Sequence, residues 1–107
     1  MTKILISPGY GAGWSTWSDK EHEKFALTYQ PLIDYLEAND GDNDSAEFGA
    51  LVDQFIKDLK AEFGEDASFY TGGARDLCVV DVDGPFSVRE YDGFESITTS
   101  NDFISLD

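Results

Sequence analysis

Basic residues are scarce in this chain. Among its 107 residues, 22 are Asp or Glu and only 7 are Lys or Arg, which gives a formal net charge of −15 at pH 7. So large a negative surplus repels nucleic acid and anionic membranes, and it favours basic surfaces, including those of proteins that bind nucleic acid. We therefore expect no direct nucleic-acid partner and no membrane partner.

Cysteine and histidine are each present once. Cys78 cannot form an internal disulfide, and its position in the apolar run LCVVDV is typical of a small buried hydrophobe. His22 is the only histidine, which excludes sites that need two, and its place on the first turn of an expected helix predicts an exposed side chain. Neither residue indicates a catalytic or metal site.

Paired carboxylates are the remaining candidates for acid-base chemistry. Asp81 and Asp83 fall on one face of an expected strand, as do Glu90 and Asp92. Both pairs adjoin turns, where a solvent-facing rim explains them more simply. We predict no catalytic residue, no metal ligand and no cofactor, and hence a protein that is not an enzyme.

Long hydrophobic runs are also absent. No apolar segment approaches the roughly 20 residues that span a bilayer, and the first residues, MTKILIS, lack the features of a signal peptide. The length suits one globular domain with a modest core. We expect a single domain over residues 1–107, located in the cytoplasm.

Hydrophobic periodicity predicts one strand followed by two helices. The strand covers residues 3–7, and a capping-box spacing from Ser18 to Glu21 predicts the start of the first helix. Pro31 interrupts that helix, so we expect a kink near Gln30. The second helix should run from an N-cap at Ser45 to a terminator at Gly64.

Beyond residue 66 the pattern changes to short β-type runs separated by turn residues. These runs are SFYT, LCVVDV, FSVREY, FESITT and DFISL. The expected order is β-α-α-β-β-β-β, an α+β fold in which two helices, one of them kinked, pack on a mixed, mostly antiparallel sheet.

The segment GYGAGWSTW is the most unusual stretch of the chain. It lies in residues 1–18, which contain no acidic residue, and it combines three glycines with both tryptophans. It is neither G-x-G-x-x-G nor a Walker motif. Glycines nevertheless let backbone N–H groups approach a ligand, hydroxyls donate hydrogen bonds, and aromatic rings offer stacking surfaces.

We expect Arg75 to form the opposite side of a ligand site at this segment. If residues 68–71 form a strand parallel to the first one, residues 72–75 emerge at the same sheet edge. Arg89, on a later strand, is a weaker candidate for this role. The predicted ligand-binding residues are Gly9, Tyr10, Gly11, Gly13, Trp14, Ser15, Thr16, Trp17 and Arg75. The alternative is that both tryptophans fill the core while the glycines let the chain turn tightly.

The connection between the helices is strongly acidic. Asp40, Asp42 and Asp44 have the D-x-D-x-D spacing of a calcium loop, but Ser45 and Leu51 stand where glycine and glutamate are required. A solvated acidic connection is the better interpretation. The wider set could form a negative face that mimics nucleic acid, comprising Asp19, Glu21, Glu23, Asp34, Glu37, Asp40, Asp42, Asp44 and Glu47.

Two segments resemble a group of small proteins encoded by tailed bacteriophages and prophages. They are KILISPGYGAGWSTW near the start and GPFSVREYDGFESI near the end. The group has no established activity, so no residue role carries over. The resemblance implies a small accessory protein acting in the cytoplasm of an infected bacterium, where countering host defence is a common task.

Two functions remain open at this point. The first is a non-enzymatic protein that binds a small anionic or nucleotide-like ligand through the glycine and aromatic segment, and so sequesters a host defence signal. The alternative is an acidic interaction protein that inhibits a basic host protein which binds nucleic acid or acts in defence.

Overall fold

The computed structural model describes residues 2–9, 13–84 and 86–99, with side-chain burial described as far as residue 97. The described elements are β1 (Thr2–Ile6), η1 (Ser15–Trp17), η2 (Lys20–His22), α1 (Glu23–Leu27), α2 (Gln30–Ala38), α3 (Ala46–Phe63), η3 (Gly72–Asp76), β2 (Cys78–Val82), β3 (Phe86–Tyr91) and β4 (Phe94–Thr99), where η marks a 3-10 helix.

The fold is of the α+β class, as predicted, and its first helix is broken at the expected place. The helix stops at Leu27 and resumes at Gln30, with Pro31 in the first turn of α2. Proline lacks an N–H donor and disfavours helical geometry in the residue before it, so a new helix start is the position where it costs least.

The long helix α3 also agrees with the sequence. The side chain of Ser45 accepts a hydrogen bond from the backbone N–H of Phe48, and Gly64 ends the helix with φ +111°. Its buried face carries Phe48, Phe55 and Leu59. The spacing of these apolar residues predicted this element because helix packing requires one continuous stripe.

The strands form two antiparallel pairs. β1 pairs with β2, with Leu5 opposite Val79, and β3 pairs with β4 through a tight turn at Asp92 and Gly93. Both turn residues have positive φ, 54° and 87°, which suits a two-residue hairpin connection.

The expected strand over residues 68–71 is wrong. This segment has no strand partner, and the chain then forms η3 and returns as β2, antiparallel to β1. The described strands therefore make antiparallel ladders where a mixed sheet was predicted. The last predicted run, DFISL, lies outside the described residues.

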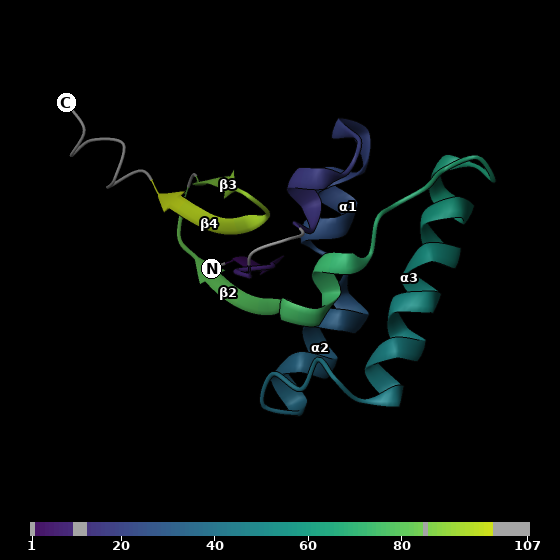
Figure 1. The fold of residues 1–107 in the computed structure, drawn as a ribbon, viewed down its shortest axis with the longest axis horizontal. Coiled ribbons are helices and arrows are strands. Elements are labelled where there is room, and N and C mark those ends of the chain that lie inside the picture. Colours follow the sequence, from purple (N-terminus) through teal and green to yellow (C-terminus); the bar gives the residue numbers. More distant parts are fainter. Residues whose placement is uncertain (1, 10–12, 85, 100–107) are drawn as a thin grey trace.

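The β1–β2 ladder lies between the helices and the β3–β4 hairpin (Figure 1). Leu5 belongs to the cluster that includes the helices, whereas Ile4 and Ile6 pack in a second cluster with Phe86 and Ile97 of the hairpin. Strand β1 is thus buried on both faces, which explains its continuous apolar sequence.

An aromatic group fills the centre of the helical cluster. Phe55 of α3 contacts Trp14, Phe25, Tyr29 and Phe69, with ring centroids 4.9–5.6 Å apart. Aromatic residues bury large areas and favour tilted or edge contacts, so this group supplies much of the packing in a small domain. None of the helices in the described part is long and apolar enough to cross a membrane.

Candidate functional site

A buried carboxylate organises the segment that follows β1. Glu95 of β4 is 0% exposed. Its Oε1 accepts a hydrogen bond from the Ser7 N–H at 2.8 Å, and its Oε2 accepts from the Trp14 N–H at 2.7 Å. The N–H and hydroxyl of Thr16 also donate to Oε2, at 3.0 and 2.5 Å.

These donors converge on the chain's own carboxylate, whereas the sequence predicted that this segment would bind a separate small anionic ligand. Several convergent N–H groups can stabilise a buried negative charge that would otherwise be very costly. A signal for this role was available, because Glu95 shares the core-facing side of its strand with Ile97. Sequence reasoning missed it because this alternation with Ile97 does not by itself separate a buried acid from an exposed one.

The two tryptophans have different environments. Trp14 is 0% exposed, and its Nε1 donates to the carbonyl oxygen of Ala26 at 2.9 Å. Trp17 is 42% exposed and stacks on Tyr70, which is 59% exposed, with ring centroids 5.8 Å apart. Trp14 is therefore a core residue, in line with the alternative interpretation, whereas Trp17 and Tyr70 present an aromatic surface.

Glu90 on β3 accepts a hydrogen bond from the exposed Trp17. Its Oε2 accepts hydrogen bonds from the backbone N–H of Gly93 at 2.6 Å and from Nε1 of Trp17 at 3.2 Å. These two bonds, the one from Gly93 first, lower the pKa of the Glu90 carboxyl. The hairpin turn and the aromatic surface are therefore linked through one carboxylate.

Glycines allow residues 9–17 and η3 to pack closely against each other. A Cβ on Gly73 would clash with the carbonyl oxygen of Gly13, and one on Gly9 would clash with the side chain of Asp76. The hydroxyl of Ser7 donates to the carbonyl oxygen of Gly73 at 2.8 Å. The predicted meeting of the two segments thus occurs, but through backbone contact at η3 and without a parallel strand.

Arg75 lines a different surface from the one predicted. Its exposed side chain borders an open hollow of about 300 Å³ at the start of α3, whose lining also includes Asp44, Ser45 and Asp53. Among the described residues of the glycine segment, none lines this hollow. Two of the predicted residues, Tyr10 and Gly11, lie outside the described part of the chain.

Ser15 and Thr16 line another hollow, of about 350 Å³, against β3. Its other walls come mainly from Leu27, Phe86 and Val88, and the described residues around it include one carboxylate and no Lys or Arg. Apolar walls without a cation suit a neutral or apolar group better than an anion. That the glycine segment binds a ligand stays a prediction.

An acidic hollow lies between the end of α2 and strand β2. It measures about 360 Å³, and its lining consists of Leu36, Glu37, Asp40, Gly41, Cys78, Val79 and Asp81. Two of the carboxylates, Glu37 and Asp40, come from the end of α2 and the turn after it, and the third, Asp81, comes from β2; the leucine and valine add apolar surface. We call this group of seven residues the acidic hollow.

The chain's own Lys3 reaches the acidic hollow. Lys3 pairs across the ladder with Asp81, and its ammonium donates to Glu37. The hydrogen bond to Glu37, followed by the charges of Glu37, Asp81 and Asp34, raises the pKa of Lys3. The carboxylates at this place therefore favour a cation. Asp81 had been interpreted only as a solvent-facing rim.

The thiol of Cys78 also borders this hollow and is half-buried. Burial, with a smaller contribution from the charge of Glu95, raises the pKa of the Cys78 thiol. A thiol with a raised pKa is largely protonated at neutral pH and is a weak nucleophile. This agrees with its interpretation as a small hydrophobe.

The acidic connection between the helices is held by one hydrogen bond within it and by one to the residue before β2. Asp42 Oδ1 accepts a hydrogen bond from the Asp44 N–H at 3.1 Å, and Asn43 Nδ2 donates to the carbonyl oxygen of Leu77 at 3.1 Å. Asp40 and Gly41 turn the chain with positive φ. That this acidic connection is simply a solvated loop stays a prediction.

The predicted exposure of His22 is wrong. Its side chain is buried, because η2 turns the ring toward the end of α3, where it packs against Phe63. The expected capping box does not form either. The hydroxyl of Ser18 donates to the Ser15 carbonyl oxygen, and the helical turn begins one residue later than expected, at Lys20.

Comparison of the chain with protein-family models, with curated proteins and with solved structures finds no match.

Proposed function

We propose that this chain is a non-enzymatic binding protein that holds a basic segment of a partner protein on its acidic surface. The observation that carries the proposal is the acidic hollow, which combines apolar walls with Glu37, Asp40 and Asp81. A Lys or Arg side chain has the complementary form, because its aliphatic stem packs on apolar surface while its charged end binds carboxylates.

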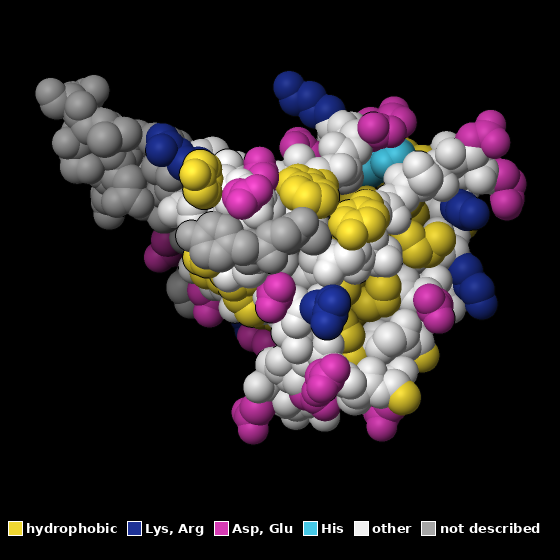
Figure 2. All heavy atoms as spheres, viewed as in Figure 1, with side chains coloured by type: hydrophobic (Ala, Val, Ile, Leu, Met, Phe, Trp, Pro, Cys, Tyr) yellow, Lys and Arg dark blue, Asp and Glu magenta, His cyan; other side chains and the backbone are white. Residues whose placement is uncertain are grey.

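The contact of Lys3 supports this assignment. It is the only Lys or Arg side chain of the described residues that forms an ion pair with a carboxylate. One ammonium group leaves a surplus of negative charge around Glu37, Asp40 and Asp81. The chain has 22 acidic and 7 basic residues, and on the face drawn in Figure 2 acidic side chains are spread over the surface among basic ones. Most of the net charge is therefore available to attract a basic partner.

The resemblance to phage proteins supplies a setting for such binding. A small acidic protein that covers a basic surface would prevent a host protein from binding nucleic acid. This mode of action needs no catalytic residue, because inhibition follows from occupancy alone.

The experiment measures binding of a fluorescent arginine-rich peptide by anisotropy. The test variant is Asp40→Asn with Asp81→Asn, and the control is Glu62→Gln with Glu65→Gln, which removes the same charge from exposed positions at the end of α3 and beyond. Asparagine tolerates the positive φ of residue 40. We expect at least tenfold weaker binding for the test variant and less than threefold for the control. If both variants lost the same amount of affinity, binding would depend only on net charge. That result would contradict a specific site at the acidic hollow.

A second candidate function is favoured by the exposed stacking of Trp17 on Tyr70. A planar nucleotide-like ligand can stack on such a surface, as the glycine and aromatic segment predicted. Titration of tryptophan fluorescence with mono-, di- and cyclic nucleotides tests it, because Trp17 is exposed whereas Trp14 is buried. A saturable change that disappears in Trp17→Phe would support this function, and an unchanged spectrum across the panel would contradict it.

A further inference from the structure

The ring of His22 is buried without a hydrogen-bond partner. Its side chain is 2% exposed, and neither Nδ1 nor Nε2 has a hydrogen-bond partner among the described residues. On one side the ring packs against Phe63, with ring centroids 4.6 Å apart. Because an unpaired buried polar atom is costly, a ligand on either nitrogen would stabilise the folded chain.

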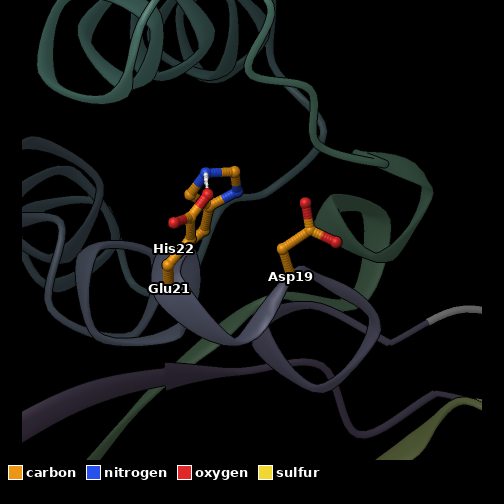
Figure 3. A group of neighbouring side chains, drawn as sticks. All are labelled: Asp19, Glu21 and His22. Carbon is orange, nitrogen blue, oxygen red and sulfur yellow. Dashed lines mark ion pairs between the residues drawn. The ribbon is translucent and has the colours of Figure 1, made fainter.

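Two exposed carboxylates lie beside the nitrogen atoms. Asp19 and Glu21 come from the same short segment as His22, and one ligand atom from each of the three residues lies within 4.8 Å of the others (Figure 3). The closest ion pair joins His22 Nε2 and Glu21 Oε1 at 3.4 Å.

These separations suit a single metal ion. Two ligands of one tetrahedral ion, each about 2.1 Å from the metal, lie roughly 3.4 Å apart. His22 and Glu21 already have this spacing. Asp19 is exposed, and its ligand atom lies within 4.8 Å of those of Glu21 and His22, so it is the third candidate ligand for the same ion.

We propose that Asp19, Glu21 and His22 bind a divalent transition-metal ion of the zinc class. An imidazole ligand favours Zn²⁺ and its neighbours over Ca²⁺ and Mg²⁺, which prefer oxygen ligands alone. Three protein ligands leave the fourth position to water. The ion would fix η2 against the end of α3, because the ligand ring is the one that packs on Phe63. The site uses no residue of the acidic hollow and stands apart from the proposed function.

The test is calorimetric titration of the chelator-treated protein with zinc chloride, supported by one-dimensional proton NMR. His22 is the only histidine, so its ring protons are a unique probe of metal binding at this site. We expect one ion per chain and a shift of the His22 ring signals during the titration. Asp19→Asn with Glu21→Gln should weaken zinc binding at least tenfold, whereas the Glu62→Gln, Glu65→Gln control should bind as the natural sequence does.

The test uses the exposed residues Asp19 and Glu21, because His22→Ala removes a buried ring and can unfold the domain. The proposal is overturned if no saturable binding is found up to millimolar zinc. It is equally overturned if the Asp19, Glu21 variant binds as tightly as the natural sequence, or if zinc leaves the His22 signals unmoved. Loss of binding in Cys78→Ser alone would place the ion at the thiol and would also reject the site.

Discussion

At the scale of single residues, the placement of Glu95 explains where the backbone N–H groups of Trp14 and Thr16 point, because both donate to its Oε2. Gly13 precedes these donors, and a Cβ at that position would clash with the side chains of Thr16 and Trp17. The sequence predicted a separate anionic ligand for this segment. It did not reveal the internal carboxylate, because that residue lies on a strand about 80 residues away.

Glu95→Gln should destabilise the fold by about 2–3 kcal/mol, because the amide group of glutamine would point a donor at N–H groups that need an acceptor. Chemical denaturation followed by circular dichroism measures this change in the free energy of unfolding. Glu62→Gln, which alters an exposed acid, is the control and should leave stability within about 0.5 kcal/mol. Equal stability of the two variants would contradict the role given to Glu95.

Tyr29 and Asp58 form a pair that makes stability depend on pH. The hydroxyl of Tyr29 donates to Asp58, and this bond, followed by one from Gln54, lowers the pKa of the Asp58 carboxyl. Burial and the contact with Asp58 raise the pKa of Tyr29. The stabilisation from Asp58 is therefore present above the ordinary carboxyl pKa of about 4 and is lost as the pH falls through the lower pKa of the folded state.

Tyr29→Phe should return the pKa of Asp58 toward its ordinary value, because the largest cause of the shift is removed. Carbon NMR of the carboxyl groups measures this, with the natural sequence as the reference. Melting temperatures at pH 7 and pH 3 should also differ less in the variant than in the natural sequence. An unchanged Asp58 titration would show that the hydroxyl does not hold the carboxylate in solution.

At the scale of elements, the sequence predicted what local patterns determine. Helix α3 follows from its apolar stripe, its Ser45 cap and its Gly64 terminator, and the helix break follows from Pro31. The expected strand at residues 68–71 failed for a tertiary reason. Phe69 packs edge-on against Trp14, with ring centroids 4.7 Å apart, so residues with high strand propensity are used for core contacts without a partner strand.

Two glycines in different elements should respond to alanine in opposite ways. Gly49 lies in α3, and a Cβ at this position would meet no other atom within 4 Å, so Gly49→Ala should stabilise the protein by about 0.5–1 kcal/mol. Gly73 in η3 faces the backbone of Gly13, so Gly73→Ala should destabilise it by at least about 1 kcal/mol. Thermal melts of both variants check the signs. A stabilising Gly73→Ala would contradict the close approach of η3 to the glycine segment.

At the scale of the whole molecule, charge is the dominant property. Composition favoured a basic host protein as the alternative to a small anionic ligand, and the fold brings carboxylates of β2 beside those at the end of α2. The negative face predicted from sequence included Glu37 and Asp40 but not Asp81. The sequence of one strand does not show which residues of other segments lie beside it. The position of Asp81 next to Glu37 and Asp40 could therefore not be predicted.

Salt should weaken binding of a basic peptide strongly. Electrostatic attraction between exposed charges is screened over about 8–10 Å at physiological ionic strength. Raising sodium chloride from about 50 to about 300 mM should therefore reduce affinity at least tenfold, measured by the same anisotropy assay. Affinity that is insensitive to salt would indicate an apolar contact and would count against the acidic surface.

The most direct test of the central claim is a proton–nitrogen NMR titration of the labelled protein with the arginine-rich peptide. We expect saturable shifts concentrated at residues 36–41 and 78–81 and at Lys3, which would be displaced from Glu37. Shifts confined to Trp17, Tyr70 and their neighbours, or spread evenly over all exposed acidic positions, would contradict the acidic hollow as the binding site.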